Sequence, residues 1–292
     1  MSSPRVFDHL VLASHDLEAQ AAFYRRLGFH VGTRNQHPWG TQNHIIQLHG
    51  AFLELIGLGP GAAAMPLHPG PRQYSFGGFI SRYLADHQGL AMLALHSREA
   101  KADAATFAAA GIGDFETFDF GRKATRPDGT AAEIAFTLAF AQSPLIPAAG
   151  FFTCQHHHPQ NFWNAEYQAH PNTAQSVRAV VLVAENPADH AEFLSGFTGQ
   201  RAMLSTSMGL EIDTGGGLIE VLTPLAWQFR YGEVLGSGKN EAHFGAFRVA
   251  VGDMATLRAC LAQSGVASKA GGDRTIVARQ MAGGAAIVFE PA

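Results

Sequence analysis

Two polar residues suited to metal binding or proton transfer stand within apolar stretches near the start of the chain. His9 lies in VFDHLVLA and Glu54 lies in FLELI. A carboxylate on an apolar strand face is costly to bury unless it is paired, neutralised or bound to a metal. We therefore interpret His9 and Glu54 as catalytic or metal-binding candidates. For His9 the alternative is a core histidine hydrogen-bonded to a neighbouring strand.

Alternation along the strands predicts which side chains accompany these two residues. Side chains two apart share a face of a strand, so Glu54 shares its face with Phe52 and Ile56. In the first strand the predicted His9 face holds Phe7, His9, Val11 and Ala13, and the opposite face holds Asp8, Leu10 and Leu12.

The elements that position His9 and Glu54 follow a β-α-β-β-β order within residues 5–58. A strand over residues 6–13 leads into a helix, and three short strands follow, the last over residues 52–58. Asp16 can accept a hydrogen bond from an early backbone N–H, and Gly28 can adopt the left-handed conformation that ends a helix. The sequence thus predicts a helix that begins near Asp16 and ends at Gly28.

The same order recurs three more times along the chain. The predicted helix start and closing glycine fall at residues 16 and 28, 99 and 111, 186 and 199, and 253 and 265. This repetition predicts an α+β fold made of four βαβββ modules. Aligning the helix starts places Met92, Ala179 and Ala246 opposite His9, while Glu220 and Glu290 match Glu54.

Loop-forming segments predict two domains, residues 1–160 and 174–292, each with two modules. The boundary falls in the polar segment of residues 156–173, and residues 59–88 form an insertion longer than ordinary connections. We expect this insertion to act as a lid or rim, with a disordered surface loop as the alternative. The C-terminal half lacks a histidine to match its acids, so we interpret it as a degenerate copy that packs against or covers the first half.

Composition excludes several classes of function. The net charge of −4 and the charged fraction of 15% make nucleic acid a poor candidate partner. Two cysteines are too few for a disulfide framework, and no apolar run is long enough to span a membrane. We expect a soluble cytoplasmic monomer or homodimer with reduced thiols. Motifs for nicotinamide or nucleotide binding and for a serine hydrolase are also missing.

The motifs FDHLVLAS, DLEAQAAFYRRLGF and FLELI, together with the repeated βαβββ order, resemble the vicinal-oxygen-chelate superfamily. That superfamily includes glyoxalases, extradiol dioxygenases and bleomycin resistance proteins, and the stretch HPWGTQNHIIQL is similar to its glyoxalase-like domain branch. The resemblance implies that two modules form a half-barrel sheet, or cup, with helices packed outside. Many chemistries share this scaffold, so the resemblance specifies the fold better than the reaction.

The resemblance also implies a metal site built from the first and last strands of each module. His9 and Glu54 match two ligand positions, and the second module must supply another ligand. Met92 or His96 on its first strand and Cys154, Gln155 or His156 on its last strand are available. We take Gln155 and His156 as the predicted additions to the site. Imidazole with carboxylate suits divalent iron, manganese, zinc or nickel.

Substrate contacts are predicted from aromatic and amide side chains near the same strands. Trp39 and Trp163 could line an apolar pocket, and either Asn43 or His44 could hold a substrate oxygen, since alternation turns only one of them into the cup.

Our first hypothesis is therefore an enzyme acting on a small oxygen-bearing organic substrate. It would be a metal-dependent lyase, isomerase or dioxygenase in which a histidine moves the proton. The alternative is a metal-free protein that sequesters a small molecule, as bleomycin resistance proteins do. A purely scaffolding role leaves Glu54 unexplained.

Overall fold

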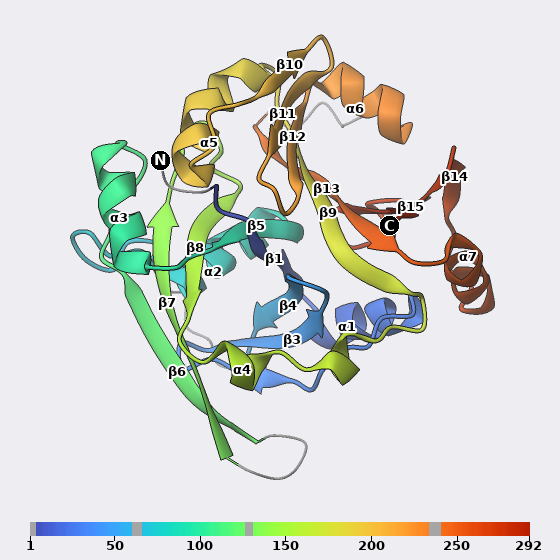
Figure 1. Ribbon diagram of the computed structural model, residues 1–292, viewed down its shortest axis with the longest axis horizontal. Helices are drawn as coiled ribbons and strands as arrows, with labels where there is room; N and C mark the ends of the chain where they lie inside the picture. The colour runs from blue at the N-terminus through green and yellow to red at the C-terminus, as the bar shows by residue number, and fades with distance from the viewer. Residues whose placement is uncertain (1–3, 60–65, 126–130, 234–240) are drawn as a thin grey trace.

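Two mixed β-sheets of eight strands each form the frame of the molecule (Figure 1). The computed structural model describes residues 4–59, 66–125, 131–233 and 241–292. The first sheet has the strand order β2-β3-β4-β1-β5-β8-β7-β6, and the second has the order β10-β11-β12-β9-β13-β16-β15-β14. Each order joins two βαβββ modules through their first strands, so the predicted α+β fold of four modules is confirmed.

The first sheet contains modules one and two. Their elements are β1 (Phe7–Ala13), α1 (Leu17–Arg26), β2 (Asn35–Gln36), β3 (Thr41–Gln47), β4 (Phe52–Leu58), β5 (Gly89–His96), α3 (Ala100–Ala109), β6 (Phe118–Thr125), β7 (Ala131–Ala141) and β8 (Gly150–His156). The Asp16 side chain accepts a hydrogen bond from Ala19 N at the start of α1, and Gly28 has a φ of 85° just beyond its end. Both predicted helix signals are thus confirmed.

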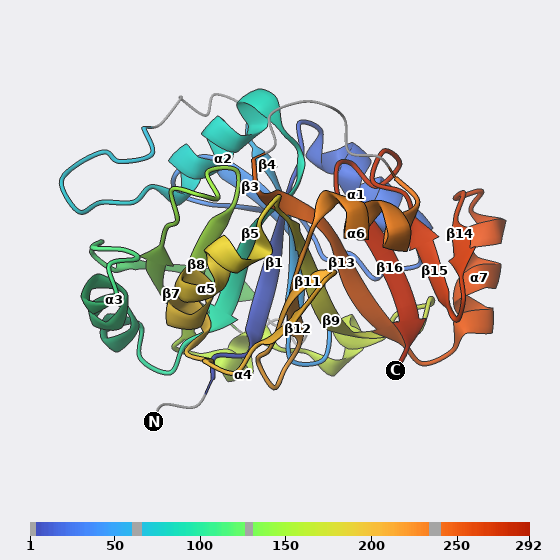
Figure 2. The ribbon, with the colours of Figure 1, turned by 90° about the horizontal axis from the view of Figure 1, so that it is seen from above.

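The second sheet contains modules three and four. Short helical turns lead into it from β8, namely α4 (Pro159–Phe162) and η1 (Ala165–Gln168). Its elements are β9 (Ala174–Val183), η2 (Pro187–His190), α5 (Ala191–Thr198), β10 (Leu204–Thr206), β11 (Gly209–Asp213), β12 (Leu218–Leu222), β13 (His243–Val251), α7 (Met254–Gln263), β14 (Lys269–Gly271), β15 (Arg274–Val277) and β16 (Ala286–Pro291). In Figure 2, β1, β5, β9 and β13 lie near the middle of the molecule, and α3 and α7 lie toward opposite ends.

A helix follows the last strand of modules one and three and covers the concave face of its own sheet. These helices are α2 (Phe76–Asp86) and α6 (Pro224–Tyr231). Side chains of α2 join the apolar cluster on the concave face of the first sheet, and Trp227 and Tyr231 of α6 do the same in the second. Helix α2 of the insertion therefore covers part of the cup. Thr223 caps the start of α6, and Gly232 ends it in the left-handed conformation.

Strand pairing corrects the residues that correspond to His9 in modules two and four. His9 pairs with Ala94 across β1 and β5, and Ala179 pairs with Arg248 across β9 and β13. Ala94 and Arg248, rather than Met92 and Ala246, thus occupy the His9 position. Aligning helix starts failed because modules two and four have two residues fewer between this position and the helix cap.

A β-bulge changes the predicted faces of β1. The register with β5 shifts between Phe7 and His9, so the alternation of side chains is interrupted there. Phe7 packs in the core on the outer face of the sheet, whereas Asp8 hydrogen-bonds His9 and His156 on the concave side. The prediction that Phe7 shares a face with His9 and that Asp8 opposes it is therefore wrong.

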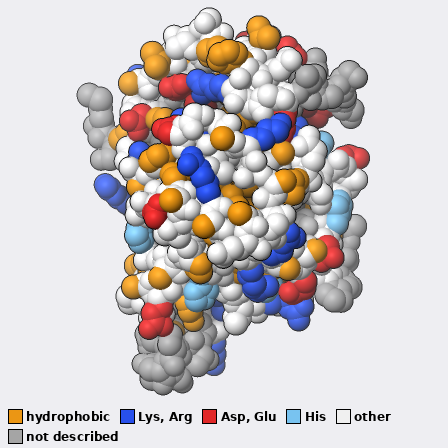
Figure 3. Space-filling model, turned by 90° about the vertical axis from the view of Figure 1, so that its right-hand side faces the viewer, with side chains coloured by type: hydrophobic (Ala, Val, Ile, Leu, Met, Phe, Trp, Pro, Cys, Tyr) orange, Lys and Arg blue, Asp and Glu red, His pale blue; other side chains and the backbone are white. Residues whose placement is uncertain are grey.

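A single apolar core joins the outer faces of both sheets and the helices between them. Phe107 of α3 meets Phe197 of α5 at 6.0 Å between ring centroids, and Phe29 meets Phe289 at 6.1 Å. The surface in Figure 3 intersperses acidic, basic and apolar side chains. Among the described residues, no helix is both long and apolar enough to cross a membrane.

Candidate active site

The concave face of the first sheet encloses a small cavity, which we call the inner cavity. Its volume is about 50 Å³, which is space for a few water molecules. It is lined by His9, His37, Trp39, Asn43, Ile45, Phe52, Glu54, Phe76, Phe120, Arg122, Phe136, Leu138, Phe152, Cys154 and Phe162. Most of this lining is aromatic or aliphatic, so the few polar groups within it meet in surroundings of low polarity.

Asp8 holds two histidine rings in place beside this cavity. One carboxylate oxygen lies 2.5 Å from His9 Nδ1, and the other lies 3.0 Å from His156 Nε2. Burial alone would raise the pKa of Asp8, but its interactions with His156 and His9 outweigh burial and hold that pKa well below its usual value. Asp8 is therefore ionised, and it leaves His9 Nε2 free to act within the cavity.

Glu54 lies at the centre of the polar groups in the inner cavity. Its Oε2 is 3.9 Å from His9 Nε2, its Oε1 is 3.7 Å from His37 Nε2, and Asn43 donates a hydrogen bond to Oε1. The predicted arrangement of Phe52, Glu54 and Ile56 on one strand face is confirmed, because all three side chains face the concave side.

His37 is a site residue that the sequence analysis had not selected. Its Nδ1 lies 2.8 Å from Thr41 Oγ1, and its ring stacks on Trp39 at 4.5 Å between centroids. Asn43 Nδ2 lies 3.3 Å from His37 Nε2, which suits a neutral ring that accepts at this nitrogen. Burial is the main cause that lowers the pKa of His37. The signal available in the sequence was the proximity of His37, Trp39 and Asn43 in one stretch.

Module two contributes Cys154 and His156 to the same region. In module one, Glu54 pairs with Val11, which lies two residues after His9. In module two, Cys154 pairs with His96, which lies two residues after Ala94. Because Ala94 is the counterpart of His9, Cys154 is the counterpart of Glu54. Burial, together with the negative charges of Asp8 and Glu54, raises the pKa of the Cys154 thiol well above its usual value. One donor atom from each of Asp8, Cys154 and His156 lies within 4.8 Å of the others.

The structure separates the other predicted site residues. Trp39 and Asn43 face the inner cavity, whereas His44 points to the other side of β3 and lies 2.7 Å from Gly32 O. Gln155 also points away from the cup, because its side-chain oxygen accepts a hydrogen bond from Ala100 N at the start of α3. Neither His44 nor Gln155 can therefore contact a ligand of the inner cavity.

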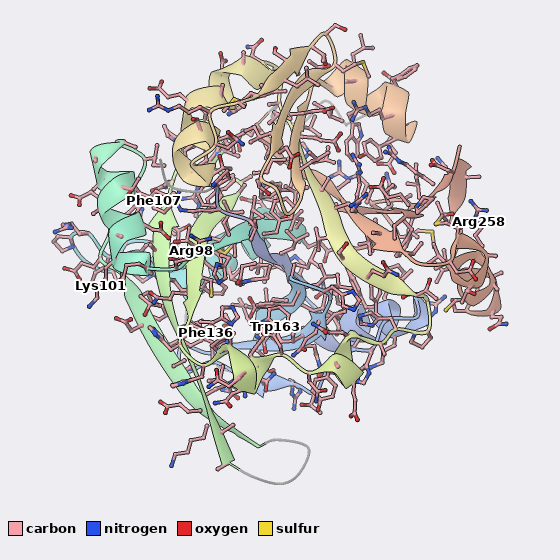
Figure 4. The ribbon with its side chains drawn as sticks, in the orientation of Figure 1. Arg98, Lys101, Phe107, Phe136, Trp163 and Arg258 are labelled. Carbon is pink, nitrogen blue, oxygen red and sulfur yellow. The ribbon has the colours of Figure 1, made fainter. Side chains whose placement is uncertain are left out.

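Trp163 lies outside the inner cavity and lines a larger neighbouring hollow, which we call the outer hollow. Figure 4 shows Trp163, after α4, near Phe136 of β7. The Trp163 ring stacks against His156 at 6.1 Å between centroids. Trp163 is thus placed to support His156 and to face the outer hollow, rather than to contact a group held at His9.

The corresponding position in the second sheet is filled by an ion-pair network. Arg248 donates hydrogen bonds to both Glu220 and Glu290, at 2.7 Å to the former and at 3.0 to 3.2 Å to the latter. Arg230 also binds Glu220, and Arg274 also binds Glu290. The guanidiniums of Arg248, Arg230 and Arg274 thus neutralise the two acids that repeat Glu54, as expected if this half is a degenerate copy.

The donor groups around His9 fit a divalent ion. Nitrogen and oxygen ligands lie about 2.0 to 2.2 Å from such an ion, so two of them can be up to about 4.4 Å apart. The 3.9 Å separation of His9 Nε2 and Glu54 Oε2 meets this limit. Asp8 on His9 Nδ1 resembles the carboxylates that orient metal-bound histidines. An ion held instead by Asp8, Cys154 and His156 would compete with the hydrogen bonds that Asp8 already makes.

Comparisons with known proteins agree with this architecture. The family model described as "Glyoxalase-like domain" matches residues 7–198, which is more than half of the chain. The chain belongs to the glyoxalase-like domain family. This membership confirms the resemblance to the vicinal-oxygen-chelate superfamily. No curated protein matches this glyoxalase-like protein.

Several solved structures share the fold of the glyoxalase-like protein at low sequence identity. A hypothetical protein from Staphylococcus aureus has a TM-score of 0.64 at 11% identity, with 98% of this chain and 99% of that chain covered. A mutant of 4-hydroxymandelate synthase from Streptomyces coelicolor has a TM-score of 0.57 at 11% identity, with 98% and 92% covered. A xylose isomerase-like TIM barrel/4-hydroxyphenylpyruvate dioxygenase fusion protein has a TM-score of 0.51 at 13% identity, with 91% of this chain and 39% of that chain covered.

Proposed function

We propose that this glyoxalase-like protein is a metal-dependent enzyme that binds a small oxygen-bearing organic substrate in its first cup. The observation that carries the proposal is the geometry of His9, whose Nε2 faces Glu54 at 3.9 Å in the inner cavity while Asp8 holds Nδ1. His9 and Glu54 would hold the ion, and Cys154 or His156 would complete the set. Divalent iron, manganese, zinc and nickel all suit imidazole and carboxylate ligands.

When bound, the ion would supply Lewis-acid stabilisation of negative charge on a substrate oxygen. Asp8 keeps His9 in the tautomer and orientation that present Nε2 to the cavity. Asn43 fixes the Glu54 carboxylate through its amide. The aromatic walls lower the polarity of the site, which strengthens each of these interactions. Lyase, isomerase and dioxygenase types all fit this constellation, and the likeness to the 4-hydroxyphenylpyruvate dioxygenase fusion protein adds support for the last.

We propose His37 as the group that moves a proton to or from the substrate. Its ring is fixed by Thr41 on one side and by Trp39 on its face, and Nε2 points toward Asn43 and Glu54. A general base needs a defined orientation within hydrogen-bond reach of the substrate, and His37 has that orientation. His9 would then serve the ion rather than the proton.

Elemental analysis of untagged protein purified without chelator tests the metal proposal. We expect about one equivalent of metal in the parent protein, loss of the metal in His9→Ala and Glu54→Gln, and retention in His96→Ala. His96 is the matched control because its ring is exposed at the end of β5. No binding after anaerobic reconstitution with Fe(II), Mn(II), Zn(II) and Ni(II) would overturn the proposal.

A metal-free binding protein is the second candidate function. Its support is the pair Ala94 and Cys154, because neither offers the histidine or carboxylate expected at the module-two ligand positions. The outer hollow, together with the aromatic cavity beside it, could retain an apolar molecule. If this candidate is correct, reconstituted protein binds no metal, and Glu54→Gln binds small aromatic molecules as tightly as the parent protein does.

A further inference from the structure

Arg122 of β6 lies at the boundary between the inner cavity and the outer hollow. Three residues line both spaces, namely Ile45, Arg122 and Phe162. The outer hollow has a volume of about 550 Å³, far larger than the inner cavity. A molecule that enters the cup through the outer hollow would therefore pass the guanidinium of Arg122 before it reaches His9 and Glu54.

The sequence of β6 explains why this guanidinium faces the cup. Phe120 and Arg122 are two residues apart on one strand, so they share a face, and both line the inner cavity. Asp119, on the opposite face, instead accepts a hydrogen bond from Thr137. Arg122 thus places a positive charge next to Phe120 on the aromatic face of β6 that lines the cavity.

Arg122 has no counter-ion in the part of the chain that the structure describes. Eight ion pairs involve other arginines, and Arg248 contacts two carboxylates by itself, as Arg230 does. No hydrogen bond or ion pair from Arg122 occurs among the described residues. Partial burial is the main cause that lowers its pKa, which reflects the loss of water around the charge. A half-buried cation that lacks both water and a counter-ion is stabilised when an anion enters the cavity and pairs with it.

Trp39 provides a second, independent indication that the inner cavity awaits a polar ligand. Its indole N–H is buried and has no hydrogen-bond partner among the residues that the structure describes, although the ring lines the same cavity. Buried donors are normally paired, so an unpaired one beside a binding cavity suits an acceptor on the ligand. A carboxylate or another oxygen of the ligand can supply such an acceptor.

We infer that the ligand of the cup is a small carboxylic acid with an apolar, aromatic-sized body, and that Arg122 is its specificity-determining residue. Guanidinium and carboxylate match as planar groups that form two parallel hydrogen bonds. The inner cavity, at about 50 Å³, has room for the carboxylate, and the body of the ligand would lie in the outer hollow of about 550 Å³, whose lining includes Phe162, Trp163 and Tyr167. The inference rests on the proposed function only in assigning the ligand to the His9 site.

Matched probes separate charge recognition from simple apolar binding. We would measure binding of phenylacetate, phenylacetamide, phenyl phosphate and benzenesulfonate by calorimetry to the parent protein, Arg122→Gln, Arg122→Lys and Arg98→Gln. The amide is a neutral probe of the same shape as phenylacetate. Arg98 is the control because it lies near α3, outside the cup (Figure 4), and lines a separate surface hollow.

We expect the parent protein and Arg98→Gln to prefer phenylacetate over the amide by about tenfold or more, as a charge-assisted hydrogen bond predicts. Arg122→Gln should lose this preference while keeping its fold by circular dichroism and its metal content. Arg122→Lys should retain only part of it, because an ammonium cannot form the two parallel bonds. An unchanged preference in Arg122→Gln, tighter binding of phosphate or sulfonate than carboxylate, or no binding of any probe at millimolar concentration would overturn the inference.

The same experiment distinguishes this inference from the proposed function. If the protein holds no metal but still selects carboxylate through Arg122, the metal proposal fails and the carboxylate assignment stands. If metal is bound at His9 and Glu54 but carboxylate is not selected, the carboxylate assignment fails and the metal proposal stands.

Discussion

Replacing Arg248 with methionine should destabilise the protein, because this change leaves two buried carboxylates short of a partner. The Arg248 side chain is 10% exposed, and the side chains of Glu220 and Glu290 are 2% and 9% exposed. Removing one partner from a buried ion pair typically costs about 3 to 5 kcal/mol of unfolding free energy. Arg230 still binds Glu220 and Arg274 still binds Glu290, so we expect a loss near the lower limit, about 3 kcal/mol.

Urea unfolding followed by circular dichroism measures this loss, and thermal unfolding should show a fall in Tm of roughly 6 to 12 °C. Arg274→Gln is the matched control. Its side chain is 37% exposed, and exposed ion pairs contribute less than about 1 kcal/mol. The metal content of Arg248→Met should equal that of the parent protein, because we assign the ion to the first cup.

A triple variant, Arg248→Met with Glu220→Leu and Glu290→Leu, distinguishes unpaired charge from lost packing. Apolar residues of similar volume often replace a buried ion network without loss of stability, so the triple variant should recover most of the stability lost in the single variant. Our reasoning is refuted if Arg248→Met unfolds at the same urea concentration as the parent protein. It is equally refuted if the triple variant is as unstable as the single one.

Three further predictions use the helix ends, the thiols and a buried histidine. A Cβ at Gly28, where φ is +85°, would lie 2.5 Å from Cys260 Sγ. At Gly111 φ is also positive, but nothing lies within 4 Å of an added Cβ. Gly28→Ala should therefore lower the urea midpoint clearly more than Gly111→Ala does. Iodoacetamide at pH 8 should modify Cys260 before Cys154, since Cys154 is buried and its pKa is raised, and equal labelling by mass spectrometry would contradict this order. Burial lowers the pKa of His170 below 6.5, so the unfolded chain binds the proton more readily than the folded protein does. The free energy of unfolding should therefore fall as the pH drops below 6.5. A urea midpoint that depends equally on pH in His170→Gln would argue against this cause.

Much of the candidate site follows from local sequence patterns. The spacing of polar and apolar residues in β4 correctly places Glu54 among concave-side residues. Asp16 and Gly28 define the first helix, as their chemistry predicts. These features depend on side-chain alternation and helix capping, which act over a few residues and can therefore be inferred from the sequence.

The remaining site residues depend on contacts between distant segments. The bulge that turns Asp8 into the cup arises from pairing between β1 and β5, and no pattern within β1 predicts it. His37 comes from the turn between β2 and β3, and its role depends on how that turn folds over Glu54. Alternation puts Arg122 on the same face as Phe120, but the order of strands in the first sheet decides that this face lines the cavity.

The sequence by itself determined the fourfold βαβββ order, the ends of the helices and the presence of a histidine and an acid in the first module. Only the tertiary structure decided which residues join that pair, and that Arg248 fills the equivalent place in the second sheet. The physical reason is that side-chain periodicity and helix capping depend on local backbone geometry. Register between strands and the partners of buried charges are instead fixed by packing across the whole fold.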